Sequence, residues 1–227
     1  MSSASDSAAS AAPAQPAQPA LLATRSAGKL RELRPLFAAH GLDVVDLGSA
    51  GVAETANEDA LEVHSTFEEN ALAKARYFFE RTGRPTFADD SGLEVDALGG
   101  GPGVLSKRWS GRTDLAGQAL DDENNRLLLE RLRGTAERGA RYVCAAAYVD
   151  GGREIVCRGE AEGRIAEVAS GANGFGYDPY FISAELGRSF GEASREEKER
   201  VSHRGRAFRA LVSLVSPRAR SQPSRCS

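Results

Sequence analysis

The chain has 227 residues, of which 41% are hydrophobic and 27% charged, and its formal net charge is −3 at pH 7. This length and composition suit one globular domain, and the small net charge provides no global field that would favour nucleic acid or an anionic membrane. No apolar run approaches the roughly 18 residues of a membrane-spanning helix, and the 3 cysteines lack paired spacing, which predicts a reduced, cytoplasmic protein.

Both ends of the chain differ in composition from the rest. Residues 1–19 consist mainly of Ala, Ser, Pro and Gln, which predicts a disordered tail rather than a secretory signal. Residues 217–227 are rich in Arg, Ser and Pro and predict a flexible C-terminal tail. A single domain is therefore expected over residues 20–216.

The domain is predicted to open with a strand, a loop, a helix and a second strand. Residues 20–23 form a short apolar run, residues 29–40 have apolar side chains at helical spacing, and residues 42–47 alternate like a strand. The loop at 24–29 would present backbone N–H groups and a positive helix end, which suits phosphate, although it lacks Walker A spacing. A plain helix start is the alternative interpretation.

A second helix is predicted at residues 66–82, after a polar, irregular segment. Thr66 and Glu69 form a capping-box pattern at its start. Asn70 and Lys74 lie one turn apart and are candidates to face a polar cleft. The alternative is an exposed helix face with routine charge pairing.

Two adjacent carboxylates, Asp89 and Asp90, follow a short predicted strand at residues 85–88. Neighbouring acids repel each other, so they destabilise a strand end unless a cation binds there, and Mg²⁺ is the obvious candidate because it takes hard oxygen ligands. The alternative is a solvated turn, since Asp-Ser-Gly is ordinary turn chemistry. The glycine-rich residues 92–111 predict a loop, and residues 114–133 a helix.

The C-terminal half is predicted to hold a hairpin, an aromatic loop and two helices. Strands are predicted at residues 141–149, 153–157 and 160–168, and helices after the capping box of Ser194 and Glu197 and again at 207–215. Glycines flank Phe175 and Tyr177 in the loop, so that a ring could stack on a nucleobase or, alternatively, plug the core.

Lys198, His203 and Arg204 supply donors and positive charge near the C-terminus. The last two are donors that could pair with a carbonyl oxygen on a base edge, although a His-Arg pair on a helix usually lies at the surface. A phosphate loop, an acid pair, a stacking ring and base-edge donors together make the inventory of a nucleoside triphosphate site.

These motifs resemble the inosine/xanthosine triphosphate pyrophosphatase family. Matching blocks occur in the family's order at residues 23–33, 66–71, 88–93, 98–103 and 174–179, and at 195–198 with 202–204. The resemblance implies an α/β fold: a long twisted mixed β-sheet flanked by helices, in two lobes with the active-site cleft between them. It also implies a homodimer that hydrolyses ITP, dITP and XTP to the nucleoside monophosphate and pyrophosphate with Mg²⁺, clearing them from the nucleotide pool.

The resemblance also implies roles for individual residues. Asp90 matches the proton acceptor and metal-linked carboxylate, and Glu62 is the nearest match to a further metal-site glutamate. Supporting roles fall to Asp89, Lys74, Glu69 and Asn70. Substrate contacts are expected from Thr24, Arg25, Ser26, Ala27, Gly28, Lys29, Ser91, Phe175, Gly176, Tyr177, Asp178, Lys198, His203 and Arg204.

The chain departs from the family pattern at a few positions. Ser26 stands where the family usually has Asn, and Leu105 and Lys107 replace Tyr and Ala in the stretch after the glycine-rich turn. Two other functions remain open: a nucleotide sensor without turnover, which an acid pair beside the phosphates disfavours, and a pyrophosphatase for pyrimidine or modified nucleotides. A panel of nucleotides with Mg²⁺ separates these hypotheses by their products.

Overall fold

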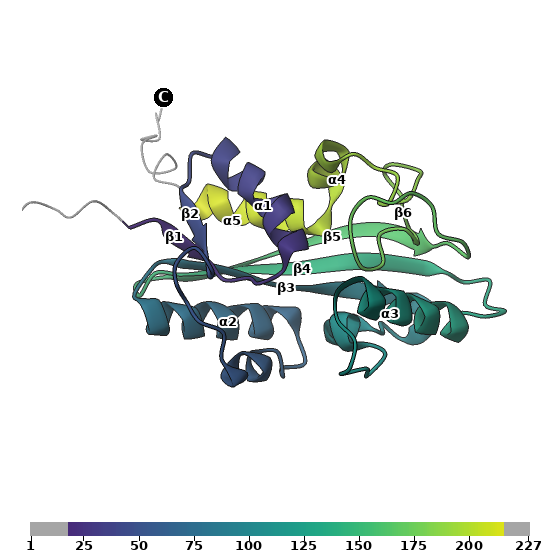
Figure 1. Cartoon of the computed structure of the whole chain (residues 1–227). Coiled ribbons are helices and arrows are strands. Elements are labelled where there is room, and N and C mark those ends of the chain that lie inside the picture. Colours follow the sequence, from purple (N-terminus) through teal and green to yellow (C-terminus); the bar gives the residue numbers. More distant parts are fainter. Residues whose placement is uncertain (1–17, 216–227) are drawn as a thin grey trace, which may run out of the picture.

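The computed structural model describes residues 18–215, in which helices cover both faces of a mixed sheet (Figure 1). The 6-stranded sheet has the order β2-β1-β3-β4-β5-β6. Its strands are β1 (Ala20–Leu22), β2 (Val44–Asp46), β3 (Thr86–Val95), β4 (Gly139–Val149), β5 (Glu154–Ile165) and β6 (Phe181–Ser183). The predicted mixed sheet flanked by helices is therefore confirmed, whereas the predicted tails lie almost wholly outside the described residues.

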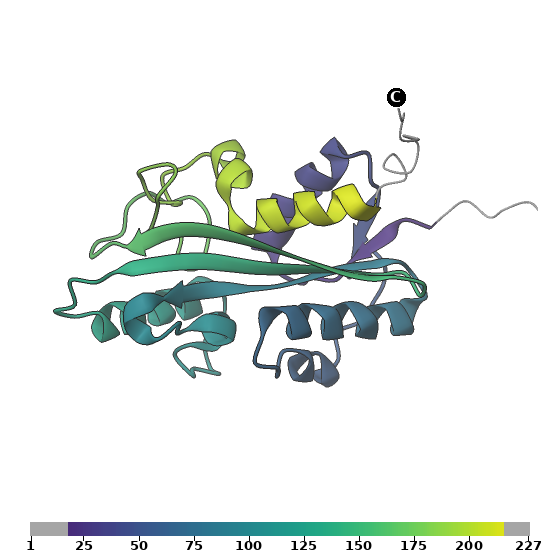
Figure 2. The same cartoon turned by 180° about the vertical axis from the view of Figure 1, so that it is seen from behind.

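Helices pack on the two faces of this sheet in distinct groups. The α-helices are α1 (Ala27–Ala39), α2 (Phe67–Thr82), α3 (Gly117–Arg131), α4 (Arg195–Val201) and α5 (His203–Val215), and the 3₁₀ turns are η1 (Ala56–Leu61), η2 (Asp96–Leu98) and η3 (Gly103–Arg108). Figures 1 and 2 show α1 and α5 on one face and α2 on the other. No helix among these is long and apolar enough to span a membrane.

Buried side chains of β3 alternate between the two layers, as strand geometry requires. Phe87 packs into the core beneath α1 and α5, where its ring centroid lies 4.8 Å from that of Phe37. Ala88 packs into the core beneath α2, against Ala71 and Phe78. Successive residues of β3 therefore face different helices, and this alternation decides the direction of the acids that follow.

One edge of β3 is open in its middle. β1 runs parallel to β3 but pairs only with Thr86 and Phe87, whereas β4 runs antiparallel along the other edge as far as Val95. Beyond Phe87 the only further bridge on the open side joins Glu94 to Pro102 in the described part of the chain. The intervening backbone groups of β3 are therefore available to side chains from α1 and α2.

The prediction that a strand ends at residue 88 was wrong. β3 continues through Asp89 and Asp90 to Val95, because β4 offers a pairing partner along its whole length. Gly92, predicted to start a loop, lies within the strand where η3 packs closely. A Cβ atom there would lie 2.3 Å from the carbonyl oxygen of Gly103 and 2.4 Å from the hydroxyl of Ser106.

Smaller differences occur in the C-terminal half. The two predicted strands at 153–157 and 160–168 are one continuous strand, β5, and the short strand β6 within residues 181–183 was not predicted. The last helix begins at His203 rather than at 207, since only Ser202 leaves helical geometry between α4 and α5.

Replacing Gly92 by Ala is expected to destabilise the protein by about 1–3 kcal/mol, the usual cost of overpacking, because the new methyl group would collide with backbone. The matched control is Gly152→Ala, since a Cβ atom there meets only the Asp150 carboxylate, at 3.8 Å. Urea unfolding measures both variants. Equal midpoints would contradict the close approach of η3 to β3.

Candidate active site

Two lysines from opposite faces of the sheet meet at the open edge of β3. Lys29 of α1 and Lys74 of α2 direct their Nζ atoms at the backbone carbonyl of Asp89, at 3.5 and 3.0 Å. That carbonyl is accessible because β1 has already ended. Positive charge is therefore concentrated at this edge between α1 and α2, where it could bind an anionic substrate.

Asp89 and Asp90 point to opposite faces of the sheet rather than forming a shared acid pair. Asp89 Oδ2 lies 3.0 Å from Lys29 Nζ and 3.3 Å from Arg204 Nε, on the side of α1 and α5. Asp90 Oδ2 accepts a hydrogen bond of 2.8 Å from Asn70 of α2. The expected repulsion between the two carboxylates is thus relieved by strand geometry, and each acid has its own surroundings.

Asp89 is an ionised anchor for cationic side chains. It is 1% exposed, and although burial opposes ionisation, Lys29 and Arg204 hold the pKa of its carboxyl well below the usual range. The Ser91 hydroxyl donates to the same Oδ2 atom at 3.3 Å. Asp89 therefore orients Lys29 and Arg204, while its Oδ1 atom is buried without a partner in the described residues.

Asp90 is the carboxylate with the properties of a general base. It is 6% exposed, and burial, together with the charge of Glu62, raises the pKa of its carboxyl above the ordinary value despite Lys29 and Lys74. Its Oδ1 atom accepts from the Ser91 amide at 2.9 Å. A raised pKa makes Asp90 a better proton acceptor than an ordinary aspartate.

Glu62 reaches the same edge from the segment that follows η1. Its carboxylate is paired with Lys74, and its backbone carbonyl accepts from Arg108 Nη2 at 2.7 Å. Although burial opposes it, Lys74 lowers the pKa of Glu62 to about 2, with a smaller contribution from Lys29. Glu62 is therefore ionised and lies near enough for its charge to act on Asp90.

The carboxylates fit a metal ion that is shared with a substrate. No three His, Cys, Asp or Glu side chains in the described part of the chain are grouped to hold a metal ion by themselves. Asp90 and Glu62 are, however, two neighbouring carboxylates, since the pKa of Asp90 is raised first by burial and then by the charge of Glu62. Mg²⁺ commonly binds one or two carboxylates and takes its other ligands from water and substrate phosphates.

The predicted phosphate loop is shaped by its own side chains. Ser26 is the N-cap of α1, and its Oγ atom accepts from the Lys29 amide at 3.3 Å. Thr24 Oγ1 accepts from the Ser26 amide at 3.2 Å. Ala27 begins the helix, so the loop ends in a helix N-terminus whose positive end suits an anion. Arg25 turns away from this loop and pairs with Glu58.

The Phe175 ring covers the first turn of α1 instead of standing clear of the protein. A Cβ atom on Gly28 would lie 2.6 Å from this ring, so only glycine allows the contact. Lys198 Nζ lies 5.0 Å from the ring centroid. Asp178 shapes the loop, since its Oδ2 atom accepts from the Phe175 amide at 2.8 Å and from Lys198 at 2.6 Å.

Two residues of α3 that sequence reasoning missed hold the aromatic loop. Asp121 Oδ2 accepts from the Gly176 amide at 2.9 Å, and Asn125 Nδ2 donates to the Gly176 carbonyl at 3.0 Å. Tyr177 is buried, and its hydroxyl donates to the carbonyl oxygen of Ser106 at 2.7 Å. The core alternative was correct for Tyr177. No local pattern in α3 pointed to this contact with a segment 51 residues away.

A buried ion network joins the C-terminal basic residues to α1. Glu32 of α1 pairs with Lys198 at 2.6 Å and with Arg204, and both partners lower the pKa of its carboxyl although burial opposes them. Arg204 Nη2 donates to the Ser91 hydroxyl at 2.7 Å. Glu32 was missed, although its place three residues after Lys29 on a helix puts the two side chains on one face.

The remaining predicted residues differ in their surroundings. The His203 ring is buried and stacks on Tyr142 with centroids 4.6 Å apart. Burial and then the neighbouring Arg204 charge lower the pKa of His203 well below the usual value, so the ring is neutral. Its Nδ1 atom has no partner in the described residues. Glu69 accepts a hydrogen bond from the Thr66 hydroxyl at 2.9 Å, so its side chain interacts with the N-cap residue of α2.

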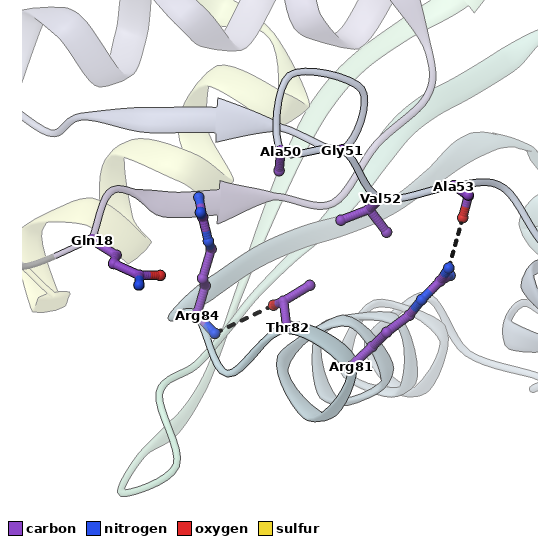
Figure 3. Close-up of a pocket in the computed structure, with 8 residues that line it drawn as sticks. All are labelled: Gln18, Ala50, Gly51, Val52, Ala53, Arg81, Thr82 and Arg84. Atoms are coloured by element: carbon purple, nitrogen blue, oxygen red, sulfur yellow. Dashed lines mark hydrogen bonds between the residues drawn. The ribbon is translucent and has the colours of Figure 1, made fainter.

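A pocket of about 590 Å³ lies between the start of α1, the aromatic loop and α4, and its lining includes Gly28, Glu32, Phe175 and Lys198. A second pocket, of about 430 Å³, lies between residues 50–53 and the C-terminal end of α2 (Figure 3). The second pocket contains none of the predicted site residues, so the first is the candidate substrate pocket.

Comparisons of the sequence and of the structure with known proteins point to the same family. The Ham1 family profile matches residues 20–214. The chain is 47% identical over 195 residues to a dITP/XTP pyrophosphatase of Frankia alni, covering 85% of this chain and 94% of the relative. For a dITP/XTP pyrophosphatase of Nitrosomonas europaea the identity is 43% over 196 residues, or 85% and 92% of the two chains. The structure of a HAM1 protein from Coxiella burnetii matches with a TM-score of 0.74 at 34% identity, covering 86% of this chain and 96% of that chain.

Proposed function

We infer that this chain, which belongs to the Ham1 family, hydrolyses non-canonical purine nucleoside triphosphates such as dITP, XTP and ITP. The family membership confirms the resemblance noted from the sequence motifs. Relatives that are pyrophosphatases argue for turnover rather than sensing. We further propose that the reaction is Mg²⁺-dependent and releases the nucleoside monophosphate and pyrophosphate.

A single observation carries the proposed mechanism. The carboxylate of Asp90 is buried, has a raised pKa, and lies at a sheet edge where Lys29 and Lys74 converge. A carboxylate whose pKa is raised by burial is suited to accept a proton from water, and the two lysines would bind a triphosphate beside it. A simple anion-binding site would gain nothing from a carboxylate of this kind.

The chemical step follows from these side chains. The oxygen of a water molecule attacks the α-phosphorus, its proton passes to Asp90, and the bond from the α-phosphorus to the bridging oxygen of pyrophosphate breaks. Lys29 and Lys74 stabilise the negative charge that develops on the phosphates, the kind of contribution that is often the largest in catalysis. Asp90 and Glu62 would hold Mg²⁺, which supplies charge neutralisation on the triphosphate when bound.

We propose that His203 takes part in selecting the base. As a neutral ring it has one N–H group, which can donate to the 6-carbonyl oxygen of hypoxanthine or xanthine but not to the 6-amino group of adenine. His203→Phe keeps a ring over Tyr142 and removes both nitrogens. The ratio of kcat/KM for ITP to that for ATP is expected to fall about tenfold. An unchanged ratio would exclude His203 as a reader of the base edge.

Product analysis tests the function as a whole. The protein is incubated with Mg²⁺ and a panel of ITP, dITP, XTP, ATP, GTP and UTP, and the products are identified by chromatography. Pyrophosphate from ITP, dITP and XTP is the expected result. Orthophosphate would indicate hydrolysis of the terminal phosphate, and preferred turnover of UTP would indicate a pyrimidine pyrophosphatase. We also propose that the protein is a cytoplasmic homodimer. Sedimentation of the purified protein measures its oligomeric state and so tests the dimer.

A further inference from the structure

Arg25 joins the phosphate loop to the segment that carries Glu62, mainly through a short ion pair with Glu58. Arg25 Nε lies 2.6 Å from Glu58 Oε2, and Arg25 Nη2 donates to Glu58 Oε1 at 2.7 Å. This bidentate pairing fixes the guanidinium of Arg25 relative to the carboxylate of Glu58, and it is stronger and more specific than a single hydrogen bond. Arg25 Nη2 also lies 3.3 Å from the carbonyl oxygen of Val52, at the start of the same segment. The Arg25 guanidinium therefore contacts both the start and the middle of residues 52–62.

We propose that Arg25 is a positioning residue that, through Glu58, holds Glu62 at the active site, and that it is not a direct ligand of the phosphates. This inference rests on the proposed function, because it gives Glu62 its part in the metal site. The proposal also explains why the charged side chain of Arg25 points away from the phosphate loop.

Glu58 gathers several contacts within its segment. Its Oε1 atom accepts from the Thr55 amide at 3.2 Å and lies 3.6 Å from Arg81 Nη1. Arg81 also donates to the carbonyl oxygen of Ala53 at 2.9 Å, a contact drawn in Figure 3. The hydrogen bonds from Arg25 are the main reason that the pKa of Glu58 is lowered. Of the two cations that pair with Glu58 within the described residues, Arg25 and Arg81, only Arg25 comes from the phosphate loop.

Glu58 and Glu62 are close in the sequence and belong to the same local element. Glu58 lies inside η1 (Ala56–Leu61), and Glu62 is the residue that ends this 3₁₀ turn. These 6 residues make about two turns of 3₁₀ helix, whose i→i+3 hydrogen bonds connect Glu58 to the end of the segment. Glu62 is itself held by Lys74 and by Arg108. A shift of Glu58 would therefore be transmitted to Glu62, and the phosphate loop and the metal carboxylate would move together.

The test compares metal affinity in four variants. The proteins are Arg25→Met, Glu58→Gln, the charge swap Arg25→Glu/Glu58→Arg, and the control Glu54→Gln. Glu54 belongs to the same segment but lies 4.0 Å from Arg25, and its side chain is 76% exposed. Each protein is saturated with α,β-methylene-ITP, and Mn²⁺ binding is titrated by electron paramagnetic resonance.

Arg25→Met and Glu58→Gln are expected to weaken Mn²⁺ binding about tenfold, the size of effect seen when groups that support metal ligands are removed. The swap should recover part of this loss and Glu54→Gln should resemble the wild type. Affinity for the analogue without metal should stay unchanged in Arg25→Met. A direct phosphate ligand would behave differently: the metal-free affinity would fall, Glu58→Gln would have no effect, and the inference would be overturned.

Two further measurements separate this inference from the proposed function. If the wild type binds Mn²⁺ no better than Asp90→Asn, the metal site itself is wrong and the inference falls with it. If the wild type binds Mn²⁺ better than Asp90→Asn but Arg25→Met matches the wild type, only the role of Arg25 is overturned. Hydrogen exchange of residues 52–62 in the metal-free protein should increase in Arg25→Met and not in Glu54→Gln, and equal exchange would contradict the link.

Discussion

Asp90→Asn is expected to lower kcat at least about 10²-fold while leaving the fold intact. The amide has the shape of the carboxylate, and its one oxygen can still accept one of the two hydrogen bonds that Asp90 accepts, from Asn70 or from the Ser91 amide. It cannot take a proton from water at neutral pH. The loss should therefore appear in kcat for ITP and XTP, measured by pyrophosphate release at saturating Mg²⁺.

The same substitution makes an opposite prediction for stability. Burial and the charge of Glu62 raise the pKa of Asp90, so ionised Asp90 opposes folding at pH values above its unfolded pKa. Removing that charge should make the metal-free protein equally or more stable at pH 7 in urea unfolding. Near-wild-type turnover would exclude Asp90 as the base, and a large loss of stability would mean that inactivity reflects misfolding.

Arg204→Met is expected to reduce the free energy of unfolding by about 3–5 kcal/mol, the range found when one partner of a buried ion pair is removed. Arg204 is the shared counter-ion of Asp89 and Glu32, and all three side chains lie in the interior of the site. Urea unfolding at pH 7 measures the loss. The matched control is Arg206→Met, whose partner Glu185 has a side chain that is 48% exposed, and which should cost about 0–1 kcal/mol.

The loss of unfolding free energy caused by Arg204→Met also depends on the charge of Asp89. Because Lys29 and Arg204 depress the folded pKa of Asp89, the stability it contributes is complete above its unfolded pKa of about 3.9 and is lost as the pH falls through the folded pKa. The substitution should therefore cost less in an Asp89→Asn background. An equal loss of stability in both backgrounds would show that the effect does not come from the ion pair with Asp89.

Local sequence patterns predicted the elements that depend on local physics. The sequence predicts a helix at residues 66–82, and α2 spans Phe67–Thr82, because Thr66 caps its start and Gly83 takes the left-handed conformation that ends it. The capping box of Ser194 and Glu197 is likewise made at the start of α4. In both cases the decisive contacts lie within a few residues of each other.

Features that depend on distant partners could not be predicted in this way. The sequence Asp89-Asp90-Ser91-Gly92 has the composition of a turn, but pairing with β4 extends it as a strand and sends the two acids to opposite faces. The partners of Glu32 lie 166 and 172 residues away, so no local window contains that network. Arg25 belongs to a phosphate-loop pattern, yet its partner Glu58 is 33 residues distant.

The route of the oxygen atom from water tests the mechanism most directly. The protein is given ITP and Mg²⁺ in water enriched in ¹⁸O, and the products are analysed by mass spectrometry. Attack at the α-phosphorus predicts one ¹⁸O atom in inosine monophosphate and none in pyrophosphate. Label in pyrophosphate would mean attack at the β-phosphorus, and label in orthophosphate would mean removal of the terminal phosphate; either result would contradict the role proposed for Asp90.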